Sequence, residues 1–206
     1  MSAAEKKSDG IGSMIKLGLV LAAYAVAACT VLAIVNNITS PVITANNIRK
    51  ANEAMKAVFP SADGFESVEG FVWSSGSGTT KIDSISLAKK DGNVLGAVTQ
   101  VSGPTYDHST IMVGMDADGI VTGMRYLENT DTPSFGMNGS SDTYTVGNGK
   151  TFYGQFAGMD SSKGFRAGET FDAISGATIT SNGIAVMMED ACSAMKDCLS
   201  QSRSGK

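Results

Sequence analysis

The sequence has few of the residues that build metal centres or disulfide frameworks. It contains one histidine, His108, and three cysteines, none of which forms a Cys-x-x-Cys pair. Cys192 and Cys198 are six residues apart in a stretch with helical periodicity, which places them on different faces of a helix and too far apart for a disulfide. The sequence therefore indicates no metal site, and we interpret the cysteines as small apolar residues of the core.

Positive charge is also scarce. The 16 Lys and Arg residues are outnumbered by 20 Asp and Glu residues, which gives a net charge of -4, and no basic patch is present. A nucleic-acid partner is excluded on this ground. Proline is rare, with 4 residues, whereas glycine is abundant, with 24. That balance favours a turn-rich domain with strands over a bundle of long helices.

Charge is absent from one long apolar run near the N-terminus, Leu17 to Val35. A helix of this length can cross a hydrocarbon core of about 30 Å. A retained membrane anchor competes with a cleaved signal peptide, since Ala25-Val-Ala27 resembles a cleavage site, and with a lipoprotein signal, since Val26-Ala-Ala-Cys29 resembles a lipobox. The apolar residues continue past both motifs, which favours the anchor.

We predict four segments: a cytoplasmic tail (1–13), a transmembrane helix (14–37), a connecting helix (38–60) and an extracytoplasmic domain (61–206). Apolar spacing from about 41 to 58 suits an amphipathic helix. Positive residues flank the span almost equally, so the positive-inside rule does not set its orientation. A short inner tail with the domain outside is the simpler topology. The flanking residues are Lys6, Lys7 and Lys16 before the apolar run that begins at Leu17, and Arg49, Lys50 and Lys56 after it.

The domain itself shows the signals of an antiparallel sheet. Asp91-Gly92 and Asp118-Gly119 each separate two apolar runs, which predicts two successive β-hairpins. Asp116-Ala-Asp118-Gly119 also begins like a calcium loop, but it lacks the later ligands that such a loop needs. A final helix is predicted from about 180 to 199 because apolar residues recur on one face. The predicted fold class is α+β.

The richest chemistry lies in the run Ser175-Gly-Ala-Thr-Ile-Thr-Ser181. This small-residue turn carries four hydroxyls and opens onto the predicted final helix, where backbone N–H groups attract a phosphate. A hydroxyl-rich cap of an ordinary helix is the alternative interpretation. No histidine accompanies the hydroxyls, so a serine-hydrolase triad is unsupported. No lysine follows the glycine, so a P-loop is excluded. A polar, Gly-rich loop from Glu128 to Lys150 is long enough to be functional.

Asp172-x-x-Ser175-Gly-Ala-Thr178 resembles the flavinylation motif of the FMN-binding domain family. In that family a flavin transferase uses FAD to attach FMN to the motif threonine through a phosphoester, which here points to Thr178. Thr180 is the nearest rival. The N-terminal span followed by Val35-Asn-Asn-Ile-Thr-x-Pro41 is similar to the G subunit of Rnf-type ferredoxin:NAD oxidoreductases. Three further stretches share the likeness: Val58-Phe-Pro60, Tyr153-Gly-Gln-Phe156-x-Gly158 and Ser175 to Gly183.

The resemblance also implies a second half of the site in the long loop. The family commonly has Glu-Thr-Pro-Gly-Leu-Gly near the flavin ring, where this chain has Asp131-Thr132-Pro133-Ser134-Phe135-Gly136. The carboxylate is one methylene shorter, and Phe135 offers a ring that can stack. The departure at Tyr106-Asp-His108 leaves these three residues without an assigned role. The expected cofactor-binding residues are Ser175, Gly176, Ala177, Thr178, Thr180, Asp131, Thr132, Phe135 and Gly136, with Asp172 in support.

The resemblance implies an electron-transfer subunit with covalent FMN in a membrane-bound complex that is coupled to Na⁺ or H⁺ movement. Its partners would be subunits with flavin or iron–sulfur centres, and no separate substrate site is expected. Two alternatives stay open. One is the C subunit of the sodium-pumping NADH:quinone oxidoreductase, which shares the motif. The other is a tethered extracytoplasmic binding or structural domain without a cofactor.

Overall fold

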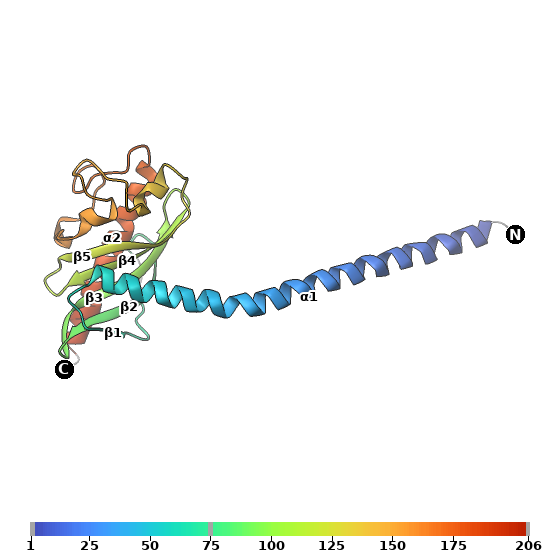
Figure 1. The fold of residues 1–206 in the computed structure, drawn as a ribbon, viewed down its shortest axis with the longest axis horizontal. Helices are drawn as coiled ribbons and strands as arrows, with labels where there is room; N and C mark the ends of the chain where they lie inside the picture. Colours follow the sequence, from blue (N-terminus) through green and yellow to red (C-terminus); the bar gives the residue numbers. More distant parts are fainter. Residues whose placement is uncertain (1–2, 74–75, 205–206) are drawn as a thin grey trace. The chain divides into compact units, whose positions relative to one another are not determined.

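The computed structural model describes residues 3–73 and 76–204, and it confirms an α+β fold (Figure 1). A long N-terminal helix is followed by an antiparallel sheet, a segment with short 3₁₀ helices, and a C-terminal helix. In chain order the elements are α1 (Ala3–Val58), β1 (Gly64–Ser67), β2 (Lys81–Lys90), β3 (Asn93–Pro104), β4 (His108–Asp116), β5 (Val121–Asn129), η1 (Gly136–Ser140), η2 (Tyr153–Phe156), η3 (Ser161–Lys163) and α2 (Thr178–Ser204).

Helix α1 is uninterrupted, although Pro41 lies inside it. The predicted membrane segment and connecting helix therefore form one element, which ends at Val58, and the boundaries of the spanning part stay a prediction. Every residue from 12 to 50 is exposed, and the helix is long and apolar enough to cross a membrane. Contacts divide the chain after Arg49, so the last turns of α1 belong to the same compact unit as the sheet.

The sheet is a meander of five antiparallel strands in the order β1-β2-β3-β4-β5. Both predicted hairpins are present. Asp91 and Gly92 join β2 to β3 with φ angles of 49° and 79°, the left-handed pair that a tight hairpin turn needs. At the β4–β5 turn, the Asp116 carboxylate accepts hydrogen bonds from the N–H groups of Asp118 (3.0 Å) and Ile120 (2.9 Å). Asp116 therefore stabilises the turn, in agreement with the hairpin interpretation of this motif.

Each face of the sheet is covered by a different helix. The larger core lies between the sheet and α2, where Val101, Ile111 and Met188 are fully buried. The smaller core lies on the opposite face, where Val58 and Phe59, at the end of α1, pack with other buried residues. Alternate residues of the strands point to opposite faces, so both cores draw on the same strands.

The end of α1 fits the sheet because two strand positions lack a side chain. A Cβ at Gly114 would lie 2.9 Å from the carbonyl oxygen of Val58, and one at Gly123 would lie 3.0 Å from its Cα. Between these glycines, the Thr122 hydroxyl donates to the same Val58 oxygen at 2.6 Å. That hydrogen bond satisfies one of the carbonyls that a helix leaves unpaired at its C-terminus.

Helix α2 begins earlier and ends later than the predicted range of 180–199. Cys192 and Cys198 are buried along it, as expected for core residues, and burial raises the pKa of the Cys192 thiol to about 12. Cys29 differs, because it is exposed on α1. The described residues contain no cluster of side chains that could hold a metal ion.

Gly183 lies in the second turn of α2, where the helix approaches the β3–β4 hairpin closely. A substitution at this position tests how close that approach must be. A Cβ there would lie 2.6 Å from the carbonyl oxygen of Pro104 and 3.0 Å from the Cα of Thr105. Both neighbours are backbone atoms, so Gly183→Ala should cost close to the upper end of about 1–3 kcal/mol for overpacking. That loss exceeds the gain in helix propensity of about 1 kcal/mol.

The measurement is the free energy of unfolding of the detergent-purified chain by denaturant titration. Gly64→Ala is the matched control, because a Cβ at Gly64 meets nothing within 4 Å. Equal stability of the two variants would show that α2 is not held against the hairpin as closely as described.

Candidate functional site

The segment between β5 and α2 has no extended strand and includes the three 3₁₀ helices η1 to η3. It is longer than the predicted loop, which was expected to end at Lys150. A segment with little regular structure leaves backbone groups that side chains must pair. In this protein those side chains fix the two stretches that the sequence singled out, 131–136 and 172–178.

The turn before α2 is held by one serine and one tyrosine. Ser181 Oγ accepts a hydrogen bond from the N–H of Ile174 at 3.0 Å and donates one to the carbonyl of Ala177 at 3.0 Å. The hydroxyl of Tyr144 accepts a hydrogen bond from the N–H of Ser175 at 3.2 Å. Ser181 is buried, so its hydroxyl stabilises the turn from the protein interior and does not contribute to a solvent-facing site.

Asp172 anchors the start of the motif to a neighbouring loop. Its carboxylate accepts a hydrogen bond from the N–H of Asn148 at 2.9 Å. Its own backbone N–H and carbonyl pair with the side-chain amide of Gln155, at 2.9 and 3.0 Å. Asp172 therefore has a supporting role in the geometry, and it does not line the cavity described below.

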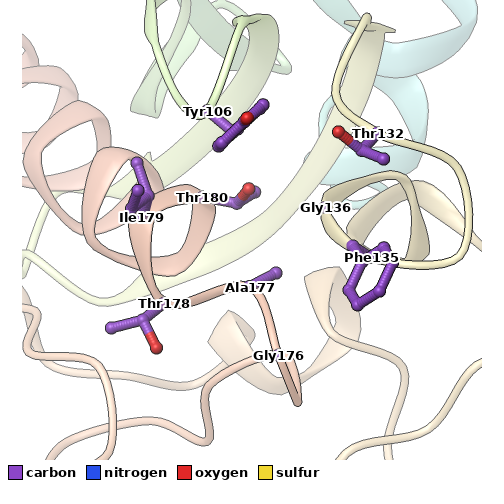
Figure 2. A pocket seen from close by; sticks show the side chains of 9 residues that line it. All are labelled: Tyr106, Thr132, Phe135, Gly136, Gly176, Ala177, Thr178, Ile179 and Thr180. Carbon is purple, nitrogen blue, oxygen red and sulfur yellow. The ribbon is translucent and has the colours of Figure 1, made fainter.

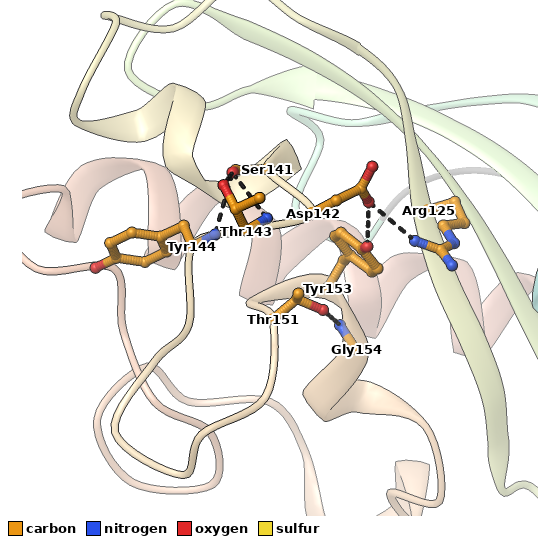
Figure 3. Close-up of polar contacts among 8 residues, drawn as sticks. All are labelled: Arg125, Ser141, Asp142, Thr143, Tyr144, Thr151, Tyr153 and Gly154. Carbon is orange, nitrogen blue, oxygen red and sulfur yellow. Dashed lines mark hydrogen bonds and ion pairs between the residues drawn. The ribbon is translucent and has the colours of Figure 1, made fainter.

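The loop that carries Tyr144 is tied in turn to strand β5 (Figure 3). Ser141 Oγ accepts hydrogen bonds from the N–H groups of Thr143 and Tyr144, at 3.2 and 3.1 Å. The hydroxyl of Tyr153 donates to Asp142, and Arg125 of β5 stacks 4.2 Å above the centre of the Tyr153 ring. The 172–178 stretch is thus connected to the sheet through the side chains of this loop and not through a strand.

Helix α2 begins with unpaired backbone donors. Its first helical hydrogen bond runs from the N–H of Ser181 to the carbonyl of Ala177, at 3.0 Å. Among the described residues, the N–H groups of Thr178, Ile179 and Thr180 have no acceptor, and Ala177 has no side-chain oxygen that could cap them. Neither Thr180 nor Ser181 caps the helix, because their hydroxyls bond to Asp131 and to the turn before α2. The site therefore offers three amides to an anion.

The opposite wall is a tight turn at residues 132–135. The N–H of Phe135 donates to the carbonyl of Thr132 at 3.2 Å, Pro133 occupies the second position, and Ser134 has a φ of 65°. A positive φ at the third position is typical of a type II turn. The turn brings the Phe135 ring beside Gly176, where a Cβ would lie 3.2 Å from a ring carbon.

Asp131 joins the two walls from behind. Its buried carboxylate accepts hydrogen bonds from the hydroxyls of Thr105 and Thr180, each at 2.6 Å, and from the N–H of Asp107 at 2.8 Å. A Cβ at Gly136 would lie 2.4 Å from Thr180 Oγ1 and 2.5 Å from Asp131 Oδ2. Glycine is therefore required at this position for the hydrogen bond between Asp131 and Thr180.

A cavity of about 400 Å³ opens between the two walls (Figure 2). Its volume lies within the usual range for small-molecule sites, about 300–1,000 Å³. Figure 2 shows Phe135 and Thr132 on one side, the start of α2 on the other, and Tyr106 at the β3–β4 turn. The lining residues are Tyr106, Thr132, Phe135, Gly136, Gly176, Ala177, Thr178, Ile179 and Thr180.

The structure brings most of the predicted site residues to this cavity. Ser175 is exposed beside it, whereas Asp131 lies behind its wall. Sequence reasoning missed Tyr106 and Ile179, whose side chains are 66% and 61% exposed. The signal for Tyr106 was its place in the short turn between two predicted hairpins.

The arrangement suits an aromatic molecule that carries a phosphate. Two exposed aromatic rings, Tyr106 and Phe135, offer faces for stacking, and the start of α2 offers amides for the phosphate. Thr178 adds an exposed hydroxyl at the same helix terminus. Among the residues that the structure describes, no Lys or Arg lines the cavity, so the helix terminus is its main source of positive potential.

Two regions of the chain match known protein families. Residues 105–193 match the family model of the FMN-binding domain, and residues 1–58 match that of the RnfG N-terminal region. The chain is 29% identical over 181 residues to the G subunit of the Na(+)-translocating ferredoxin:NAD(+) oxidoreductase complex of Acetobacterium woodii, covering 82% of this chain and 85% of that protein. The cavity lies within the region that matches the FMN-binding domain.

Ser134 gives a direct test of the turn. A residue with a side chain loses about 1–2 kcal/mol in the left-handed region, and glycine avoids this loss but gives the unfolded chain more freedom. Ser134→Gly should therefore raise the free energy of unfolding by about 1 kcal/mol, as measured by denaturant titration. Ser175→Gly is the control, since Ser175 is exposed and has no positive φ. A Ser134→Gly variant that is less stable than the parent would contradict the assigned turn.

Proposed function

We propose that this chain, which combines an RnfG N-terminal region with an FMN-binding domain, is the electron-transfer G subunit of a membrane-bound Rnf-type ferredoxin:NAD oxidoreductase complex and carries FMN covalently on Thr178. The observation that carries the proposal is the exposed hydroxyl of Thr178 at an uncapped helix N-terminus, next to a cavity with aromatic walls.

Burial supports Thr178 over its rival as the acceptor. Thr180 is 1% exposed, and its hydroxyl donates to the Asp131 carboxylate. A modifying enzyme would have to open that buried network to reach it. The hydroxyl of Thr178 is exposed and has no hydrogen-bond partner among the described residues, so it is accessible to an enzyme that brings FAD.

The attachment balances as a phosphoryl-group transfer. The Thr178 oxygen forms a bond to the FMN phosphorus of FAD, the bond to the second phosphate breaks, and AMP leaves while the hydroxyl proton is lost. The product is a phosphate diester with one negative charge. The three unpaired amides at residues 178–180 can hold that charge without a lysine or arginine.

FMN supplies one- and two-electron transfer once it is bound. The chain's own residues position it. Phe135 and Tyr106 offer aromatic faces, and Gly176 leaves room for Phe135 to lie close to the turn. The cavity is partly open to solvent, which suits electron exchange with a neighbouring carrier. We assign the cavity to the flavin and expect no separate substrate site.

The remaining features fit a subunit of a membrane complex. Helix α1 exposes an apolar surface that the chain itself leaves uncovered, so we place it in the cell membrane with a cytoplasmic N-terminus and an extracytoplasmic main domain. The partners would be subunits with flavin or iron–sulfur centres, coupled to Na⁺ or H⁺ movement. The match of residues 1–58 to the RnfG N-terminal region favours this complex over the related sodium-pumping NADH:quinone oxidoreductase.

The acceptor is tested by producing the chain with a flavin transferase and examining a denaturing gel under ultraviolet light. The parent should give a fluorescent band, and Thr178→Ala should abolish it because no other hydroxyl at the turn combines exposure with the helix terminus. The peptide that contains Thr178 should be heavier by FMN minus water in a mass spectrum.

Ser175→Ala is the control, because it removes an exposed hydroxyl from the same turn without touching the acceptor. It should keep the band. A dark band from the parent chain would refute covalent flavin, and a band that survives in Thr178→Ala but disappears in Thr180→Ala would move the acceptor to Thr180.

A further inference from the structure

The carboxylate of Asp131 places a negative charge directly behind the cavity wall. Its side chain is 2% exposed and accepts all three of its hydrogen bonds, from Thr105, Asp107 and Thr180. Two hydroxyls and one N–H surround the carboxylate as donors, which is the arrangement that satisfies an ionised carboxylate. The network thus stabilises the charge in a site that water does not reach.

Thr180 and Gly136 separate the Asp131 carboxylate from the cavity. Thr180 lines the cavity and also donates to Asp131 Oδ2 at 2.6 Å. Gly136 lines it too, and a Cβ there would lie 2.5 Å from the same oxygen. At Gly136 no side chain lies between the carboxylate and the cavity, so Asp131 influences an occupant through its electric field and not through contact.

No cation balances the charge. Asp131 is in no ion pair in the described part of the chain, and no Lys or Arg lines the cavity. A neighbouring group already responds to Asp131. The hydroxyl of Tyr126 is buried and has no hydrogen-bond partner within residues 3–73 and 76–204, and burial, followed by the charge of Asp131, raises its pKa. Charges in a site of low dielectric act more strongly than in water.

We propose that Asp131 lowers the reduction potential of the flavin through its buried charge, in addition to holding the two walls of the cavity together. Reduction adds negative charge to the flavin, and a fixed negative charge nearby disfavours it. The inference rests on the proposed function, because it concerns the group that we assign to the cavity.

The main test is Asp131→Asn in the full chain, produced with its flavin transferase and purified in detergent. Asparagine keeps the shape, can accept from Thr105 and the N–H of Asp107, and can donate to Thr180, while the charge is lost. We expect the ratio of reduced to oxidised flavin at a fixed potential to rise by about tenfold, which is about 59 mV for a one-electron couple. The readout is a potentiometric titration followed by flavin absorbance.

Asp190→Asn is the matched control. Asp190 is also buried and accepts hydrogen bonds from Ser77 and Thr80. It lies twelve residues beyond Thr178 on α2, about 18 Å along the helix axis. Its variant should leave the potential unchanged. An unchanged potential in Asp131→Asn, or an equal rise in both variants, would overturn the proposal.

Two further variants distinguish an effect of the Asp131 charge on the flavin potential from an effect of lost packing. Thr105→Val and Thr180→Val each remove one donor but leave the carboxylate charged, so the flavin should become harder to reduce. A merely loosened cavity would shift the potential of all three variants in the same direction. The valine variants also decide the matter if Asp131→Asn does not take up flavin, because a rise in potential in both of them contradicts the proposal.

Failure of this inference is distinct from failure of the proposed function. If the parent chain carries no covalent flavin, the proposed function is wrong. If the parent is flavinylated and Asp131→Asn has the potential of the parent, the proposed function stands and Asp131 has only a structural role.

Discussion

The hydrogen bond between the buried Asp131 carboxylate and the Thr180 hydroxyl is the interaction on which the site depends. It joins the loop after β5 to the first turn of α2, and Thr105 attaches the β3–β4 turn to the same carboxylate. Three segments that are distant in sequence thereby meet at one residue. A buried charge is stable only when it is hydrogen-bonded, so the carboxylate holds its donors, and with them the cavity walls, in place.

Glycines make this arrangement possible where two pieces of backbone approach closely. Gly183 lets α2 lie against the β3–β4 turn, and Gly136 leaves space for the hydrogen bond between Asp131 and Thr180. On the other face of the sheet, Gly114 and Gly123 accept the end of α1. The high glycine content, which at first indicates only turns, is thus partly a requirement of close packing between helices and strands.

Local patterns predicted the regular elements well. The Asp-Gly turns placed both hairpins, and the apolar periodicity placed α2 to within a few residues at each end. The resemblance placed Asp131 and Thr180 in one site, but the hydrogen bond between them was not predicted, because the two residues are 49 positions apart in the sequence. Their proximity depends on long-range packing, which no local pattern records. Tyr106 was left without a role because the chain departs from the family pattern there, and its neighbours in the cavity come from two distant segments.

The meander topology has a consequence for the order of assembly. Each strand from β1 to β5 pairs with its neighbour in sequence, so the sheet can form hairpin by hairpin from contacts of short loop length. The cavity cannot form in this way, because Thr180 lies 49 residues beyond Asp131 and at the start of the last helix of the described chain. Closure of the site instead requires contacts between residues that are far apart in the sequence. A transferase of the proposed kind that recognises the closed turn before α2 would therefore find it only where these distant segments have already packed together, so the proposed flavin attachment would report on folding.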